Sequence, residues 1–159
     1  MTHEVNAHEK RPAWHIRSAN SGDVHRLVGL SSQLGYVVEE GQLSRQLAAL
    51  LMRDDHAIFI AVKPDDHVLG WLHIFERPLL FQAVGAELGG LVVDELVRGQ
   101  GIGRALLDAA ERWVRARELS HLTIRSNTSR TEAHAFYQTL DYKLVKTSNT
   151  FKKVFSPSA

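Results

Sequence analysis

The sequence predicts an α/β protein with one domain, because segments typical of strands and of helices alternate along most of the chain. Apolar runs such as 57–62 have the length and composition of buried strands, whereas 102–118 repeats apolar residues at helical spacing. A chain of 159 residues can bury one sizeable core, and no internal repeat, linker or low-complexity block interrupts it. We therefore expect one domain at 13–156, preceded by a disordered tail at 1–12.

The first part of the chain is expected to form short strands and two helices. A turn at Pro64-Asp65-Asp66 separates two strand-like segments and predicts a hairpin. In chain order, we expect a strand at 14–17, a helix from Val24 to Gly35, a second helix after Glu39-Glu40, strands at 57–62 and 68–75, an unusually apolar loop at 77–86 and a strand at 87–93.

The second part continues the alternation and ends in strands. Ser129 and Glu132 match a capping box, so a helix is expected to begin there and to end near Asp141, which tolerates a left-handed conformation. The remaining elements are a helix at 102–118, a strand at 122–125 and final strands at 143–145 and 150–154.

Composition excludes several classes of site. The absence of cysteine rules out disulfides, thiolate nucleophiles and cysteine-ligated zinc, and the nine histidines lack metal-ligand spacing, so no metal is expected. No apolar run approaches the ~18 residues of a membrane span. The N-terminal stretch MTHEVNAHEKRPA has no apolar core of a signal peptide, which makes the cytoplasm the expected compartment and gives no role to a membrane.

Charge is unevenly distributed along the chain. Residues 1–97 carry 8 Lys/Arg and 13 Asp/Glu, a net charge of −5, whereas residues 98–159 carry 11 and 5, a net charge of +6. A basic second part favours an anionic ligand, although solvated helix faces produce similar splits. No Lys/Arg stripe is interleaved with aromatic residues, so nucleic acid is not an expected partner.

Three glycines lie within five residues in VRGQGIGRAL (97–106), between the apolar run LVV (91–93) and a helical pattern. Glycine permits positive φ and a close approach to the main chain. The first amides of a helix lack intrahelical partners, and the helix dipole makes that end partly positive. The stretch therefore suits either a phosphate site made of backbone amides or a plain surface turn that caps the helix.

Neither common nucleotide motif fits these glycines. The order G-x-G-x-G departs from the dinucleotide pattern G-x-G-x-x-G, and Glu118, at the distance of its acidic residue, falls at the end of a helix. No Lys-Ser or Lys-Thr follows, as a P-loop requires.

Two longer segments, LVVDELVRGQGIGRALL (91–107) and SNTSRTEAHAFYQTLDY (126–142), resemble the GNAT superfamily of N-acetyltransferases. The family motif Arg/Gln-x-x-Gly-x-Gly/Ala fits Arg98 to Gly103 without a gap, and the second segment carries A-H-x-F-Y. The order of elements agrees from about Trp14 to the end. The resemblance implies a small bacterial-type GNAT fold: a mixed, mostly antiparallel twisted sheet with splayed central strands and about four helices.

The resemblance also implies acetyl-CoA as the acetyl donor, with its pyrophosphate on the amides of residues 98–103, which we call the glycine loop. The pantetheine arm would pair with the exposed backbone of the strand before the loop, and Asn127 would bond the same arm or simply occupy a turn. The implied coenzyme residues are Leu91, Val92, Val93, Arg98, Gly99, Gln100, Gly101, Ile102, Gly103, Arg104 and Asn127.

Acetyl transfer from a thioester to an amine needs a base for the ammonium proton and an acid for the leaving thiolate. Tyr137 matches the family's general acid, and a phenol of pKa ~10 can protonate a thiolate of comparable basicity. Glu87 matches a position that the family often uses for the base, acting through water. His73 on the preceding strand is the competing base, because imidazole titrates near neutrality.

The acceptor is left open by the sequence. The connection GYVVEE (35–40) and the segment 77–81 usually shape the acceptor pocket in the family, so we take Tyr36, Glu39, His73 and Phe81 as tentative substrate residues. Glu39 and Glu40 equally suit a helix N-terminus. Small-molecule amines such as aminoglycosides, polyamines and amino acids remain candidates, as do protein N-termini.

Two further alternatives remain. The apolar stretch RPLLF (77–81) is compatible with a homodimer. A non-catalytic acyl-CoA-binding sensor or regulatory module is the competing function. A catalytically inactive relative should lose the tyrosine or the glycine loop, and this chain keeps both, which favours the enzyme.

Overall fold

The computed structural model describes residues 13–157, so the tail expected at 1–12 lies outside the described residues. The described chain forms two compact units, one ending at Ile124 and the other beginning at Arg125. Within residues 13–157 no helix is long and apolar enough to cross a membrane.

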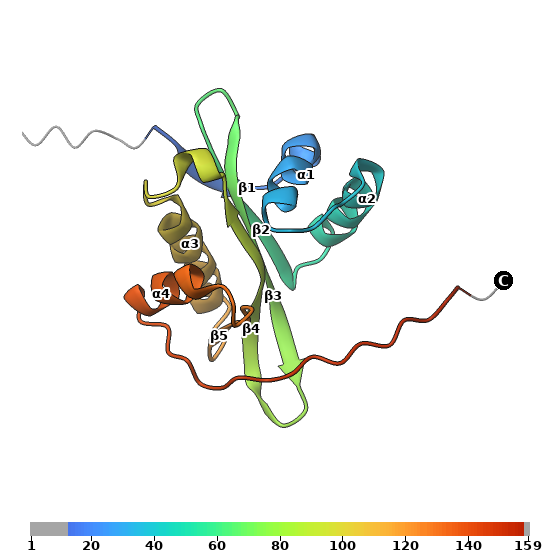
Figure 1. The fold of residues 1–159 in the computed structure, drawn as a ribbon, viewed down its shortest axis with the longest axis vertical. Coiled ribbons are helices and arrows are strands. Elements are labelled where there is room, and N and C mark those ends of the chain that lie inside the picture. Colours follow the sequence, from blue (N-terminus) through green and yellow to red (C-terminus); the bar gives the residue numbers. More distant parts are fainter. Residues whose placement is uncertain (1–12, 158–159) are drawn as a thin grey trace, which may run out of the picture. The chain divides into compact units, whose positions relative to one another are not determined.

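The first unit is built on a five-stranded mixed sheet with the order β1-β2-β3-β4-β5, which confirms the predicted class of fold (Figure 1). Neighbours among β1 to β4 are antiparallel, and β5 runs parallel to β4. The strands are β1 (His15–Ser18), β2 (His56–Val62), β3 (Val68–Leu79), β4 (Gln82–Val93) and β5 (Leu122–Ile124).

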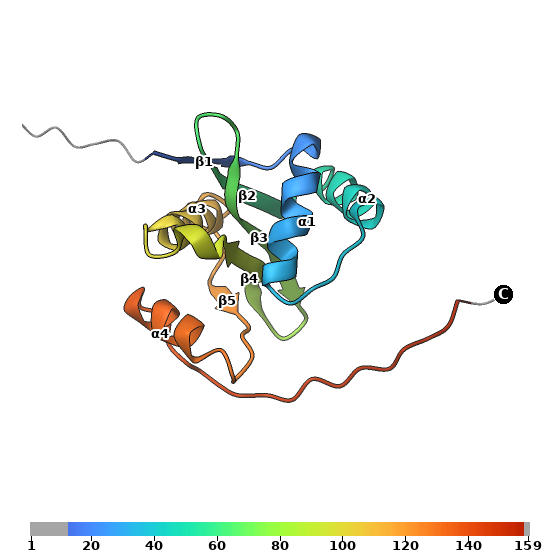
Figure 2. The same cartoon turned by 45° about the horizontal axis from the view of Figure 1, so that its top comes forward.

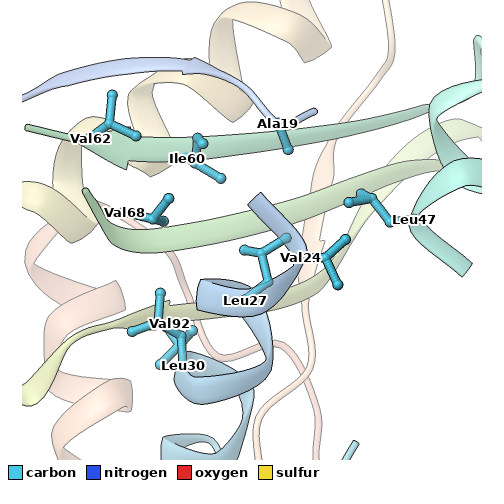
Figure 3. Packing of buried hydrophobic residues seen from close by; sticks show 9 residues of the cluster. All are labelled: Ala19, Val24, Leu27, Leu30, Leu47, Ile60, Val62, Val68 and Val92. Carbon is cyan, nitrogen blue, oxygen red and sulfur yellow. The ribbon is translucent and has the colours of Figure 1, made fainter. Parts of the chain in front are cut away.

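Helices cover both faces of this sheet. Figures 1 and 2 show α1 (Val24–Gln33) and α2 (Glu40–Leu51) on one face and α3 (Ile102–Ala116) on the other. A buried cluster under α1 and α2 joins both helices to β2, β3 and β4 (Figure 3), and it consists of Ala19, Val24, Leu27, Leu30, Leu47, Ile60, Val62, Val68 and Val92. Under α3, the side chains of Ile102, Leu106, Leu107 and Ala110 are buried. Removal of these apolar surfaces from water is the main stabilising contribution.

Local signals explain where the helices begin and end. Asn20 and Asp23 form a capping box at the 3₁₀ turn Ser21–Asp23 that leads into α1, and Gly35 adopts a φ of +95° just after it. The Glu39 carboxylate accepts a hydrogen bond from the Gly41 amide at 3.2 Å and thus caps α2. The predicted start and end of α1 and the predicted start of α2 are confirmed.

The prediction of an apolar loop at 77–86 is wrong. Strands β3 and β4 continue through this stretch, and only Leu80 and Phe81 form the turn between them. Glu87 consequently lies in the middle of β4 rather than at the start of a strand. The turn carries no Gly, Asn or Asp, so the usual hairpin signal was absent from the sequence.

Strands β4 and β5 separate after a short contact. They pair only at Ala86, Glu87 and Leu88, because β5 ends at Ile124. Among the described residues, no strand pairs with the segment Gly89–Val93 on the β5 side, while β3 pairs with it on the other side. The splayed central strands expected for the fold are therefore present.

The second unit contains α4 (Thr131–Thr139) and a long C-terminal segment. The capping box expected at Ser129 is wrong: Arg130 occupies the N-cap position without a side-chain hydrogen bond. Ser129 donates both its amide and its hydroxyl to Asn127 Oδ1, at 3.0 and 2.8 Å. The left-handed conformation of Asp141 is confirmed by its φ of +65°.

The final strands expected at 143–145 and 150–154 are also wrong. Residues 143–157 form no helix or strand, and the side chains of Leu144, Val145, Phe151, Val154 and Phe155 are exposed. Their composition favours strands, but a strand exists only with a partner for its backbone groups, and composition does not supply one.

Candidate functional site

The glycine loop connects the end of β4 to α3 through the 3₁₀ turn Glu95–Val97. Gly99 and Gly101 adopt φ values of +78° and +80°, which L side chains rarely reach. A Cβ built on either residue meets no atom within 4 Å. The glycines are thus required by the backbone conformation, and the space beside them is open.

The loop presents unpaired backbone donors at the positive end of a helix. Within residues 13–157, the first amide of α3 with an acceptor is that of Ala105, which donates to the Gly101 carbonyl at 3.0 Å. Among the described residues, the amides of 102–104 therefore have no acceptor, and the side chains of Arg98 and Arg104, close by in the sequence, are exposed. This arrangement suits a phosphate group.

A buried carboxylate, missed by the sequence analysis, anchors the start of the loop. Asp94 is 6% exposed, pairs with Arg26 from α1 and accepts a hydrogen bond from the Leu96 amide at 3.2 Å. Gln33 donates to Asp94 at 3.4 Å and accepts from the Glu95 amide at 3.0 Å. Burial alone would raise the pKa of Asp94, but these hydrogen bonds and Arg26 hold it below its ordinary value.

Asp94→Asn is expected to destabilise the protein by about 2–3 kcal/mol, because it leaves the Arg26 guanidinium without a buried counter-ion. Asp66→Asn is the matched control, since Asp66 also pairs with an arginine, Arg17, but is 77% exposed, and its loss should cost below about 1 kcal/mol. Urea denaturation of both variants provides the measurement. Equal free energies of unfolding for the two variants would contradict the anchoring role.

The open edge of β4 lies directly before this anchor. Leu91, Val92 and Val93 pair with β3 through their registers with Leu72, Trp71 and Gly70. Val92 is buried, and its two neighbours are half-buried. Their side chains thus pack in the protein, while the main chain on the β5 side has no partner strand among the described residues.

Two glycines of β4, also missed by the sequence analysis, make room for rings from β3. The His73 ring lies over Gly89, with Nδ1 2.6 Å from the position of a Cβ there, and the Trp71 ring lies over Gly90 at 2.7 Å. The register shifts at this point, so Gly89 is bulged out of the ladder. Bulges are common beside active sites because they re-aim side chains.

Glu87 lies on β4 opposite Phe75 and forms an ion pair with Arg77 at 3.0 Å. Its side chain is only 13% exposed. Glu87, Gly89 and His73 share one face of the sheet, as the β3–β4 register and strand alternation require. The two residues proposed as bases are therefore diagonal neighbours across Gly89.

His73 is uncharged at neutral pH. Burial, followed by the proximity of His56, lowers its pKa from 6.5 to about 4. Its Nε2 lies 2.9 Å from His56 Nδ1, so the two imidazoles share a hydrogen bond.

The other tentative substrate residues lie on exposed connections. Tyr36 is 64% exposed between α1 and α2, and Phe81 is 81% exposed at the tip of the β3–β4 hairpin. Glu39 takes the helix-capping role that the sequence offered as its alternative. Glu87 and His73 thus differ from Tyr36 and Phe81 in being largely buried and in having paired side chains.

In the second unit, Tyr137 packs against the rings of Phe136 and Tyr142, with centroids 5.5 and 6.2 Å away. Burial raises the pKa of Tyr137 above its ordinary value of 10, and Arg130 opposes this only in part. The phenol therefore keeps its proton at neutral pH. Asn127, earlier in the same unit, is held by its two hydrogen bonds from Ser129.

Comparison with known families gives a match to the acetyltransferase (GNAT) family over residues 25–142. This range contains both β4 with its glycine loop and α4.

Individual proteins similar to this chain are also named as acetyltransferases. The aminoglycoside N(6')-acetyltransferase type 1 of Klebsiella aerogenes is 38% identical over 84 residues, which are 49% of this chain and 55% of that relative. The protein of the same name from Stenotrophomonas maltophilia is 25% identical over 148 residues, covering 91% of this chain and 95% of the relative. The chain thus matches only about half the length of the first relative.

Among solved structures, an aminoglycoside N-acetyltransferase in complex with CoA superimposes with a TM-score of 0.80. The match covers 88% of this chain and 94% of that one, at 20% identity. At this identity the likeness shows the fold.

Proposed function

The chain belongs to the acetyltransferase (GNAT) family, and from this premise we propose that it transfers an acetyl group from acetyl-CoA to a primary amine. One observation carries the proposal: an N-terminal helix end with unpaired amides adjoins an open strand edge in sequence. The first suits a diphosphate and the second an amide-bearing chain, and acetyl-CoA contains both in succession.

Each coenzyme residue has a role in this proposal. The amides of residues 98–103 hold the diphosphate, with Arg98 and Arg104 adding positive charge. The main chain of Leu91–Val93 pairs with the pantetheine amides in the way an added strand would. Asn127 contributes a polar contact to the same arm. No metal takes part.

Starting from the ammonium form, the nitrogen loses two protons and the departing thiolate gains one. Glu87 accepts the first proton, directly or through water, and the neutral amine attacks the thioester carbonyl carbon. The carbon–sulfur bond breaks, Tyr137 donates its phenolic proton to the departing thiolate, and the second proton released by the nitrogen restores the phenol. The buried, protonated phenol suits the acid role, and the Glu87 carboxylate supplies oxygens that can accept a proton beside Arg77.

We further propose an aminoglycoside or a similar polyamine as the acceptor. Both curated relatives carry aminoglycoside N(6')-acetyltransferase names. A cationic amine is also favoured by the acidic side chains Glu39, Glu40 and Glu87, since attraction between opposite charges raises its local concentration.

Acetyl-CoA is expected to stabilise the native protein by about 2.7 kcal/mol at 100 times its dissociation constant. Dephosphorylated pantetheine, which lacks the diphosphate, should raise the melting temperature much less at the same concentration. Thermal denaturation with each compound provides the measurement. Equal shifts of the melting temperature for the two compounds would contradict binding of the diphosphate by the glycine loop.

A further inference from the structure

Two histidines from neighbouring strands form a pair on the face of the sheet that carries Glu87. His56 begins β2 and lies opposite Phe75 of β3. Its Nδ1 is 2.9 Å from His73 Nε2, and the two rings stack with centroids 5.2 Å apart. The Phe75 ring stacks on His56 and lies tilted against His73, with ring centroids 5.4 and 5.6 Å away.

We propose that His56 and His73 form a proton relay that carries the proton released by the acceptor amine from the Glu87 side of Gly89 to Asp55 and the solvent. This inference rests on the proposed acetyltransferase function. Neither histidine is the primary base in it, so both are positioning and conducting residues for the proton that Glu87 removes.

The inner end of the relay is His73 Nδ1. This atom lies where a side chain on residue 89 would stand, 2.6 Å from the built Cβ, so glycine leaves it uncovered toward β4. Glu87 precedes Gly89 by two residues in β4 and lies on the same face of the sheet as His73. The two side chains belong to diagonal cross-strand neighbours, whose backbone positions are about 7–8 Å apart. Because both side chains are long and polar, their end atoms can come closer than this backbone spacing, and one water molecule bridges polar atoms about 5–6 Å apart.

The outer end is His56 Nε2, which lies 3.9 Å from Asp55 Oδ1. The His56 side chain is 15% exposed and that of Asp55 is 32% exposed, so the path runs from half-buried sheet toward water. Arg53 holds the Asp55 carboxylate by two hydrogen bonds of 2.9 and 2.7 Å. The hydrogen bonds from Arg53 keep the pKa of Asp55 near 2, so its charge is constant at working pH.

The shared hydrogen bond determines which nitrogen carries each proton. Asp55 favours a proton on His56 Nε2, which leaves His56 Nδ1 as an acceptor. His73 Nε2–H then donates to it, and His73 Nδ1 keeps a lone pair directed toward Gly89. The low pKa of His73 means that the His73 ring of this resting pair is uncharged.

Proton transfer through the pair balances. A proton arrives at His73 Nδ1, the proton on His73 Nε2 moves to His56 Nδ1, and the proton on His56 Nε2 leaves to water beside Asp55. One proton enters and one leaves, which puts the remaining proton of each ring on Nδ1. Each ring then makes a half-turn about its Cβ–Cγ bond, exchanges protons with solvent water and turns back, which restores the starting tautomers. The charged groups around the path are Arg53 and Asp55 before β2, Arg77 on β3 and Glu87 on β4.

The first test needs no acetyl transfer. Nitrogen-15 NMR of the histidine side chains in the free protein should show His73 neutral at pH 8, with its proton on Nε2, and half protonated only near pH 4. A proton on His73 Nδ1 at neutral pH would overturn the relay, because its inner end could then accept nothing. This result is independent of whether the proposed function is correct.

The second test compares His56→Phe with wild type. Phenylalanine keeps the stack on Phe75 but breaks the path, so kcat should fall about 10-fold below pH 8 with little change in KM for the amine. Added imidazole buffer should restore part of the rate, which a purely structural defect would not allow. Unchanged kcat, or a loss that buffer does not rescue, would overturn the relay.

His25→Phe is the matched control. His25 also faces a carboxylate, Glu40 at 3.3 Å, but its side chain is 90% exposed on α1. It should keep the wild-type rate and show no response to buffer. Absence of turnover in wild type with every amine would instead refute the proposed function and leave the NMR result as the measure of the pair.

Discussion

Tyr137→Phe is expected to lower the turnover number by about 10²-fold or more while leaving coenzyme affinity unchanged. The substitution removes one oxygen and keeps the ring that packs against Phe136 and Tyr142. Without the phenolic proton, the departing thiolate has to be protonated by water. The measurement is steady-state kinetics with an aminoglycoside panel, together with the dissociation constant of acetyl-CoA.

Tyr142→Phe provides the matched control. It removes a hydroxyl from a neighbouring ring on the same unit, 6.2 Å from Tyr137 between centroids, and should keep the rate within a few-fold of wild type. Full activity in Tyr137→Phe would mean that Tyr137 only packs against its neighbours and does not act as the general acid. Tight acetyl-CoA binding by wild type without transfer to any amine would favour the non-catalytic sensor.

The pH dependence of the wild-type rate adds a second criterion. Because burial raises the pKa of Tyr137 above 10, its proton is present throughout the neutral range and is lost only at higher pH. The acid group should therefore impose no decline in rate below about pH 10. If the rate instead declines above about pH 8, and does so in Tyr137→Phe as well, then a residue other than Tyr137 causes the decline.

Local chemistry made much of the first unit predictable. Helix α1 ends where Gly35 takes a positive φ, and α3 begins where Gly101 does, because few other residues tolerate that conformation. Strands β2 and β5 are short apolar runs between turn residues. In each case, the information lies within a few residues of the element's end.

Features that depend on distant partners were not predictable in this way. The pair of Arg26 and Asp94 joins residues 68 apart, and that of His56 and His73 joins residues 17 apart. Neither spacing has a local pattern. The same limit explains the expected C-terminal strands: Phe151 and Val154 favour a strand locally, but partner strands are supplied by tertiary structure.

The candidate site also contains features that local sequence predicts and features that depend on distant partners. The glycine loop was identified because the backbone conformation itself demands glycine at Gly99 and Gly101. The Gly89-Gly90 pair was overlooked, because its requirement comes from rings on another strand rather than from its own φ. A glycine pair inside a predicted strand is nevertheless a signal of close approach or of a bulge.

Gly101→Val is expected to weaken acetyl-CoA binding by about 10²-fold, the loss of one or two charge-assisted hydrogen bonds. Gly101 is the N-cap of α3 with a φ of +80°, a conformation that costs a β-branched residue more than about 1–2 kcal/mol. The loop should relax to a negative φ, which turns the amides of 102–104 away from a common point. Isothermal titration with acetyl-CoA measures the loss.

Gly35→Val separates this effect from general strain. Gly35 has a φ of +95°, and a Cβ there also meets nothing within 4 Å, so the backbone cost is comparable. It lies after α1, outside the loop, and its variant should lose stability without losing coenzyme affinity. If Gly101→Val binds acetyl-CoA as tightly as Gly35→Val does, then the three glycines serve only to begin a helix. If the affinities differ as expected, the amides at the start of α3 are the anion site, because strain alone is matched between the two variants.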